Sequence, residues 1–303
     1  MTGIVLRSSG GVYEVETAEG VHEALLRGRL KLESRVGDRV VVGDRVEIEA
    51  ATPGPAWTIE HVDERHSALV RRAPGKAPKA KVIVANLHRV VVVFASADPE
   101  PHLRMLDRFL VLAESSDLDA VVVANKIDLL GQAAARARFH VYEEIGYRVV
   151  FTSAKTGLGV GELREILCEG ISTLTGPSGV GKSSLLNAVQ PGLGLRVSAV
   201  SERVRKGRHT TVTAELIHLE CGGYVADTPG LREIGLWGVD LDELGLYFPE
   251  FEPYLGHCRY RNSCTHSHEP GCSVRAAAER GEIAESRFDS YLRLVHGDDL
   301  DGA

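Results

Sequence analysis

The chain has 303 residues and a formal net charge of −7, from 35 basic and 42 acidic side chains. This balance excludes a uniformly basic nucleic-acid coat protein but permits local basic patches. Apolar residues make up 44% of the chain and charged residues 25%, so wholesale disorder is excluded and two or three packed domains are expected. No apolar run reaches the roughly 18 residues of a membrane-spanning helix, and the start lacks the apolar core of a signal peptide. We expect a soluble, cytoplasmic monomer with no membrane partner.

The first 65 or so residues alternate short apolar strands with turns. Gly37-Asp38 and Gly43-Asp44 are typical turn pairs. Strands are predicted at 4–7, 12–16, 21–26, 40–42, 45–49 and 57–62. Five or so alternating strands in this length indicate a small β-barrel over residues 1–68, with the OB-fold as first candidate.

A basic, proline-containing stretch runs from Arg71 to Lys81. Its composition predicts an exposed linker. The alternative is a segment that contacts phosphate groups.

From residue 82 the strands become continuous apolar runs, which are typical of parallel strands buried on both faces. Strands are predicted at 90–94, 120–124, 149–151, 171–175, 215–220 and 224–226. Helices are predicted between them at 101–116, 133–145, 161–169 and 182–189. The alternation of strand and helix predicts a doubly wound α/β domain over residues 69–237.

The loop at residues 176–183 matches G-x-x-x-x-G-K-[ST], between an apolar strand and a Leu-rich helix. Its glycines let successive backbone N–H groups face phosphate oxygens. Lys182 would act on the β- and γ-phosphates, and Ser183 would offer its hydroxyl to Mg²⁺. Nucleotide contacts are predicted for Gly176, Pro177, Ser178, Gly179, Val180, Gly181, Lys182, Ser183 and Ser184.

Two segments that follow strands predict recognition of guanine. In the N-K-x-D segment at 125–128, the Asp carboxylate can accept hydrogen bonds from N1–H and N2–H₂ of guanine, a donor pair that adenine lacks. Asn125 could bond the N7/O6 side, and the Lys126 stem could lie over the base. The segment 152–155, Thr-Ser-Ala-Lys, would contribute backbone groups to O6. Base contacts are predicted for Asn125, Lys126, Asp128, Ser153, Ala154 and Lys155.

The remaining nucleotide elements lie downstream. Asp227, at the start of the D-T-P-G segment 227–230, would hold Mg²⁺ through water, and the Gly230 N–H would meet the γ-phosphate. Thr211 would complete the Mg²⁺ shell, with Thr210 as a close alternative. These residues favour an enzyme that uses GTP or GDP with Mg²⁺ over an ATP-dependent phosphotransferase or a non-hydrolysing RNA-binding scaffold.

The order of these elements is unusual, because base recognition precedes the phosphate loop, whereas ordinary GTPases place that loop first. The domain is therefore predicted to be circularly permuted. With its N-terminal barrel, its C-terminal cysteines and the segments NKID, TSAK, GPSGVGKSS, GRHTT and DTPG, the chain resembles the RsgA (YjeQ) family. The resemblance implies a GTPase of small ribosomal subunit assembly, whose partners are that subunit and its rRNA.

The C-terminal segment, residues 238–303, carries a cysteine cluster before two predicted helices at 274–280 and 283–295. Three of the five Cys and one His follow C-x₅-C-x-H-x₅-C, which predicts a closed, structural zinc site. The predicted ligands are Cys258, Cys264, His266 and Cys272, a set that the family resemblance also implies. His257 and His268 compete for the histidine position. Cys168 and Cys221 are predicted to be plain buried thiols.

Hydrolysis requires a group that orients the attacking water. Leu231 stands where many GTPases place a Gln, and it cannot polarise water. His209 is the candidate instead, alongside Lys182 and Gly230 as catalytic groups, and the family resemblance implies the same role. The alternative for His209 is a surface side chain in a basic loop.

Three basic patches are candidates for RNA contact, at residues 27–31, 71–81 and 203–208. Each by itself is typical of a solvated surface. We hypothesise that loss of the γ-phosphate near Asp227 reorients the adjacent zinc module and releases the ribosome.

Overall fold

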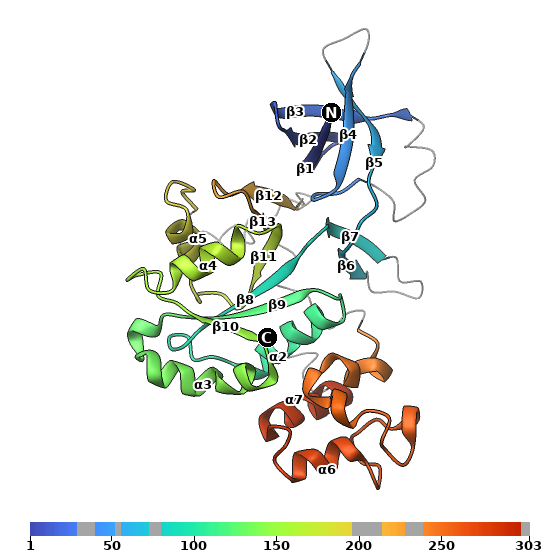
Figure 1. Cartoon of the computed structure of the whole chain (residues 1–303), viewed down its shortest axis with the longest axis vertical. Coiled ribbons are helices and arrows are strands. Elements are labelled where there is room, and N and C mark those ends of the chain that lie inside the picture. The colour runs from blue at the N-terminus through green and yellow to red at the C-terminus, as the bar shows by residue number, and fades with distance from the viewer. Residues whose placement is uncertain (29–39, 52–55, 73–79, 196–213, 228–238, 298–303) are drawn as a thin grey trace, which may run out of the picture.

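The structure is a computed structural model that describes residues 1–28, 40–51, 56–72, 80–195, 214–227 and 239–297. A strand-rich unit (blue), an α/β unit (teal to yellow) and a helical unit (orange to red) follow one another along the long axis (Figure 1). The three-part architecture predicted from the sequence is confirmed. Within the described residues, none of the helices combines the length and the apolar composition needed to cross a membrane.

The N-terminal unit is a closed five-stranded barrel. Its strands are β1 (Thr2–Ser9), β2 (Val12–Thr17), β3 (Gly20–Leu26), β4 (Arg45–Ala50) and β5 (Trp57–Val62). They hydrogen-bond in the order β1-β2-β3-β5-β4, and β4 pairs back onto β1. Alternate apolar residues such as Val5, Val15 and Ile48 fill the interior. The OB-like barrel is thus confirmed, although residues 40–42 form no strand and Val42 makes only an isolated bridge.

The predicted linker is in part a β-hairpin, which corrects the sequence-based interpretation. β6 (Ala68–Arg72) pairs antiparallel with β7 (Ala80–Ala85), while residues 73–79 lie outside the described part of the chain. Leu69 and Val84 sit opposite each other in this pair and are buried against the α/β core. Their burial favours strands, whereas the prediction had relied on the basic residues and prolines between them.

The α/β unit is built on a six-stranded sheet. Its strands are β8 (Arg89–Ala95), β9 (Asp119–Asn125), β10 (Arg148–Phe151), β11 (Ile171–Thr175), β12 (Glu215–His218) and β13 (Tyr224–Asp227). The order is β10-β9-β8-β11-β13-β12, and all neighbours are parallel except β12, which runs antiparallel to β13.

Helices cover both faces of this sheet because its central strands are apolar on both sides. In β8, Val90 and Val92 belong to the core under α2 (Leu103–Glu114) and α3 (Gln132–Ile145). Val91 and Val93 belong to the opposite core, under α4 (Val160–Leu167) and α5 (Lys182–Val189). A short 3-10 helix, η1 (Ile127–Leu129), follows β9. The predicted doubly wound α/β domain is confirmed.

The barrel is joined to the edge of this sheet. Arg7 of β1 pairs with Glu215 of β12, which makes the two sheets continuous. Glu16 of β2 bridges the same seam, because its carboxylate accepts from Tyr224 Oη at 2.8 Å and contacts His218 Nδ1 at 2.9 Å. Burial and the hydrogen bond to Glu16 raise the pKa of Tyr224 to about 12. The barrel therefore rests on the β12–β13 hairpin.

The C-terminal unit consists of short helices around an aromatic core. The 3-10 helices are η4 (Leu241–Tyr247), η5 (Pro249–Tyr254) and η6 (Arg261–Ser263), followed by α6 (Ser273–Glu279) and α7 (Glu285–His296). Phe248, Phe251 and Tyr291 pack against one another through ring contacts. Val111 of α2 joins this core and so links it to the α/β unit.

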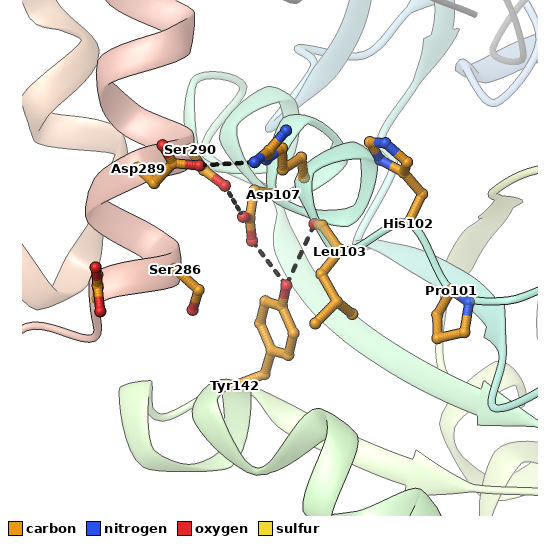
Figure 2. A pocket seen from close by; sticks show the side chains of 10 residues that line it. Pro101, His102, Leu103, Asp107, Tyr142, Ser286, Asp289 and Ser290 are labelled. Atoms are coloured by element: carbon orange, nitrogen blue, oxygen red, sulfur yellow. Dashed lines mark hydrogen bonds and ion pairs between the residues drawn. The ribbon is translucent and has the colours of Figure 1, made fainter.

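A buried ion-pair network fastens α7 to α2. Arg287 is 1% exposed and donates to Asp107 and to Glu250, each at 2.6 Å. Asp107 also accepts from Ser290 and from Tyr142 Oη, so α2, α3 and α7 converge on one carboxylate beside a cleft (Figure 2). Although burial opposes the charge, the two carboxylates raise the pKa of Arg287. Removing Arg287 would cost about 3–5 kcal/mol, because the buried carboxylates of Asp107 and Glu250 would lose the cation that they share.

Candidate functional site

The predicted nucleotide residues that the structure describes gather along the edge of the central sheet where the parallel strands end. β9, β10, β11 and β13 run parallel, so their carboxyl ends lie at the same edge, where open α/β sheets bind ligands. The N-K-x-D segment begins at the last residue of β9, residues 152–155 follow β10, the phosphate loop follows β11 and Asp227 ends β13. The tertiary structure thus brings together four segments that span more than a hundred residues of chain.

The phosphate loop has a backbone that only glycine tolerates at its key positions. Gly176 has φ +130°, and a Cβ there would lie 2.1 Å from the carbonyl oxygen of Val93. Gly181 has φ +96° and immediately precedes α5, whose first N–H groups have no partner within the helix. Lys182 Nζ donates to the Gly176 and Pro177 carbonyl oxygens at 2.6 and 2.5 Å. The loop therefore places an ammonium group and a helix N-terminus at one concave turn.

Asn125 connects the base segments to the phosphate loop. Its side chain is 1% exposed, and Nδ2 donates to the Val180 carbonyl oxygen at 2.8 Å. Its Oδ1 accepts from Thr152 Oγ1 at 3.2 Å and from the Ala154 N–H at 3.3 Å. A buried amide is costly unless it is hydrogen-bonded, so these contacts hold the segments together. The sequence reasoning had assigned Asn125 only to the base.

Asp128 and Ser153 form the second link between the base segments. Ser153 Oγ donates to Asp128 Oδ1 at 2.7 Å, and the Thr156 N–H donates to the same hydroxyl oxygen at 3.2 Å. The hydrogen bond to Oδ1 thereby orients the Asp128 carboxylate. Lys155 lies next to this pair with an exposed side chain, and Ala154 is half-buried.

A loop that the sequence reasoning missed completes this edge. Ser96, directly after β8, donates to the Asn125 carbonyl oxygen through both its N–H and its hydroxyl, each at 2.7 Å. Lys126 has a left-handed backbone with φ +61°, and its Nζ donates to the Asp98 carbonyl oxygen. Arg138 of α3 donates to the Ser96 carbonyl oxygen at 2.8 Å. A polar Ser-Ala-Asp-Pro run after a fully buried strand was the available signal.

Four predicted site residues lie outside the described part of the chain: His209, Thr210, Thr211 and Gly230. Their roles stay predictions. Of the remaining magnesium candidates, Ser183 is half-buried at the start of α5, and Asp227 is exposed at the end of β13. Ser178 and Gly179 are exposed on the loop, whereas Val180 is buried under it. Ser184 is half-buried on the first turn of α5.

The cysteine cluster of the C-terminal unit is compact and buried. One ligand atom from each of Cys258, Cys264, His266 and Cys272 lies within 4.8 Å of the others. His266 Nδ1 is 3.4 Å from the sulfur atoms of both Cys258 and Cys272. Three thiols and one imidazole at this spacing are compatible with tetrahedral zinc. His268 is exposed and bonds Ser267 instead.

The protonation of the cluster fits a metal site. Burial lowers the pKa of His266, which keeps its imidazole neutral and able to donate a lone pair. Burial also raises the pKa of Cys264 to about 12. A thiolate at Cys264 therefore needs a neighbouring positive charge, which a divalent cation would provide, whereas hydrogen bonds from Ser273 and Val274 lower the pKa of Cys258 against the effect of its burial.

Cys168 and Cys221 form a disulfide, which corrects the prediction of two plain buried thiols. Their Cα atoms are 5.3 Å apart, within the usual range for such a bond. The residues are 53 positions apart, so no local spacing pattern announced the pair. Both side chains are half-buried.

Comparisons with known proteins identify the family. Residues 62–237 match the family described as RsgA GTPase, and residues 2–57 match the RsgA N-terminal domain. The chain belongs to the RsgA family. This RsgA chain is therefore a GTPase, which confirms the predicted hydrolysis of GTP and the recognition made from its motifs.

Relatives cover the RsgA chain almost from end to end. Proteins named small ribosomal subunit biogenesis GTPase RsgA from Gemmatimonas aurantiaca and Moorella thermoacetica are 49% and 47% identical to it over 295 residues. Each match covers 97% of this chain and 96% of the relative.

Two solved structures share the fold. YjeQ from Thermotoga maritima has a TM-score of 0.80 and 38% identity over 100% of this chain and 99% of that one. YloQ, described as a circularly permuted GTPase, has a TM-score of 0.75 and 29% identity over 98% and 94%. The predicted permutation is thus confirmed.

We predict that Gly181→Ala weakens binding of GDP and GTP about tenfold or more. A Cβ at this position would lie 2.5 Å from Asn125 Nδ2, and the backbone has φ +96°. Displacing the amide would break the link between the loop and the base segments. Fluorescent-nucleotide titration measures the effect. Gly161→Ala is the matched control, because Gly161 lies in α4 and an added Cβ there would meet no atom within 4 Å. Equal affinities for both variants would contradict the bridging role of Asn125.

Proposed function

We propose that this RsgA-family GTPase acts in late assembly of the small ribosomal subunit. It would hydrolyse GTP to GDP and phosphate, be stimulated by the subunit, and leave it in a nucleotide-dependent manner. The observation that carries the proposal is the match of residues 62–237 to the RsgA GTPase family, together with relatives named for biogenesis of this subunit. The subunit's rRNA is the proposed binding surface.

Guanine specificity is assigned to Asp128. Its Oδ1 accepts from Ser153, which leaves the other oxygen to accept from N1–H and N2–H₂ of guanine. The backbone of Ser153 and Ala154 would contact O6, while Lys126 and Lys155 would flank the base. Adenine presents no matching donor pair, so we propose that ATP is a poor substrate.

Phosphate binding is assigned to the backbone of residues 176–184 and to Lys182. The ammonium group already lies over the loop through its contacts with Gly176 and Pro177. Arrival of phosphate would exchange these carbonyl partners for β- and γ-oxygens, a stronger, charge-assisted pairing. Mg²⁺, held by Ser183, Thr211 or Thr210, and Asp227 through water, would supply positive charge to the phosphates.

His209 is the proposed residue that orients the attacking water, with the Gly230 N–H on the γ-phosphate. The proposal rests on the sequence, where Leu231 occupies the position of the usual Gln and His209 directly precedes Thr210 and Thr211. An imidazole can accept a hydrogen bond from water and align it for in-line attack.

Cys258, Cys264, His266 and Cys272 would hold one structural zinc ion, which would crosslink the loop between η5 and α6. Four protein ligands leave no position for water, so the ion would stabilise the module rather than react. We assign the functional units as barrel 1–68, GTPase domain 69–237 and zinc module 238–303.

RNA contact is assigned to the basic patches at 27–31, 71–81 and 203–208. The seam between barrel and sheet supports a coupling of RNA to nucleotide state. Along the chain, β12 comes after the Thr210–Thr211 segment and before Asp227, and it pairs directly with β1 of the barrel. A change at either nucleotide segment would therefore act on an element that the barrel holds. We further propose that the protein is a cytoplasmic monomer that binds through phosphates, so that its affinity for the subunit falls steeply with salt.

We predict that purified small subunits raise the rate of phosphate release from GTP by at least about tenfold. We expect this increase because the proposed function couples GTP hydrolysis to the bound small subunit. The measurement is multiple-turnover phosphate release with small subunits, large subunits or neither, and competition by GDP and ADP. An unchanged rate with small subunits would overturn the proposed role, and competition by ADP equal to that by GDP would overturn guanine specificity.

His209→Ala is predicted to lower turnover about 100-fold while leaving GTP affinity within about twofold. The reason is that the imidazole acts on water and not on the nucleotide. Single-turnover hydrolysis and nucleotide titration separate these effects. His140→Ala, which removes an exposed His on α3, serves as the control. Normal turnover in the His209 variant would remove this residue from the mechanism.

Cys264→Ser is predicted to abolish the proposed binding of one zinc ion per chain and to lower the Tm of the zinc module. Removing one of four ligands opens the site to water and weakens binding. Metal content by atomic emission and thermal unfolding report the effect. His268→Ala should retain the metal, because its side chain lies outside the cluster. Full zinc content after Cys264→Ser would contradict the assignment.

A further inference from the structure

The disulfide between Cys168 and Cys221 lies near the amino ends of β11 and β13, whereas the candidate nucleotide site lies at the carboxyl ends of the parallel strands. Cys168 is the C-cap residue of α4, and Cys221 lies in the turn between β12 and β13. The turn is pressed against the helix end, since a Cβ at Gly223 would lie 2.0 Å from the Leu167 carbonyl oxygen. The two cysteines are therefore held near each other by packing as well as by the bond itself.

The bond joins the starts of two strands that carry the phosphate chemistry. β11 begins at Ile171 and β13 begins at Tyr224, each three residues after its cysteine (171 − 168 and 224 − 221). Ile171 pairs with Tyr224 in parallel register, and the Tyr224 N–H donates to the Gly170 carbonyl oxygen at 2.8 Å. The far ends of these strands lead to the phosphate loop and to Asp227.

The bond also closes a long loop. The cysteines are 53 positions apart, and the residues between them include the phosphate loop, α5 and the segment with His209. Closing such a loop removes conformational entropy from the unfolded chain. In addition, the Glu220 N–H donates to Gln190 Oε1 at 2.8 Å, which ties the same turn to the residue that ends α5. The turn at Cys221 is thus fastened to both helices of this face.

The pair is chemically distinct from the other three cysteines. Cys258, Cys264 and Cys272 are buried in the zinc-compatible cluster, whereas Cys168 and Cys221 are half-buried. A small thiol or disulfide can therefore reach the pair from solvent. Reduction of the pair would leave the metal ligands intact.

We propose that Cys168 and Cys221 form a redox-reversible staple that stabilises the phosphate-binding half of the GTPase domain in its oxidised state. The oxidant is a low-molecular-weight disulfide such as glutathione disulfide. One cysteine thiolate attacks it and releases one glutathione thiolate, and the second cysteine thiolate then attacks the mixed disulfide and releases the other. Two thiols are oxidised, one external disulfide is reduced, and the two cysteine protons pass to the released thiolates.

The test uses the full-length, zinc-loaded protein equilibrated in glutathione buffers from reducing to oxidising. Alkylation of free thiols followed by peptide mass spectrometry should recover the Cys168–Cys221 crosslink in oxidising buffer and two alkylated cysteines in reducing buffer. The Tm should fall by roughly 5–10 °C on reduction. Failure of the crosslink to form in oxidising buffer would overturn the proposal, and this readout requires no variant.

The double variant Cys168→Ser/Cys221→Ser is the control for the zinc cysteines, which it retains. Its Tm should match that of reduced native protein and be independent of the buffer. If the Tm of the double variant still falls on reduction, the effect of reduction belongs to the zinc cluster, and the proposed stabilisation by the Cys168–Cys221 disulfide is overturned. Hydrogen exchange on the reduced native protein should accelerate in β11 and β13 and be unchanged in the barrel strand β2. Uniform acceleration would equally overturn it.

Discussion

The buried side-chain amide of Asn125 is the contact on which the geometry of the nucleotide site depends. Its two polar atoms are withdrawn from water, and such a group is tolerated only when it is hydrogen-bonded. Val180 lies on the phosphate loop, and Thr152 and Ala154 lie on the second predicted base segment, so one amide sets the distance between that segment and the phosphate loop. Ser96 holds the backbone of the same residue from a fourth segment. The permuted chain order does not disturb this arrangement, because contacts at a sheet edge depend on strand order in space.

The same sheet serves as the frame for the other two units. On one side β12 pairs with the barrel, and Glu16 bonds both His218 and Tyr224 across the seam. The C-terminal unit is attached to α2, which covers one face of the sheet, through the buried Arg287 network. The Arg287 network consists of charged groups that are paired where they are buried, which makes it specific in geometry. The contact between Glu16 and His218 is partly exposed. Movements of the β12–β13 hairpin would reach the barrel directly, because β12 pairs with β1.

Much of the fold followed from local patterns. Alternating apolar residues predicted the barrel strands, and continuous apolar runs predicted the parallel sheet, because a strand buried on one face differs in composition from one buried on both. The errors arose where local composition misled. Arg71 to Lys81 is basic and contains prolines, yet its ends belong to β6 and β7, since Leu69 and Val84 are buried in the core. Residues 40–42 have an apolar pattern but form no strand.

The sequence alone determined the chemistry of this protein: the phosphate loop at 176–183, the guanine segments, the permuted order and the Cys₃His set. These are encoded in residue types at short spacings, where chemistry demands particular side chains and backbone freedom. Only the tertiary structure decided the bridging by Asn125, the disulfide of Cys168 with Cys221, and the pairing of Asp107 with Arg287. Those partners stand 55, 53 and 180 residues apart. Contacts at such distances depend on how helices and strands pack, and no local periodicity records that packing.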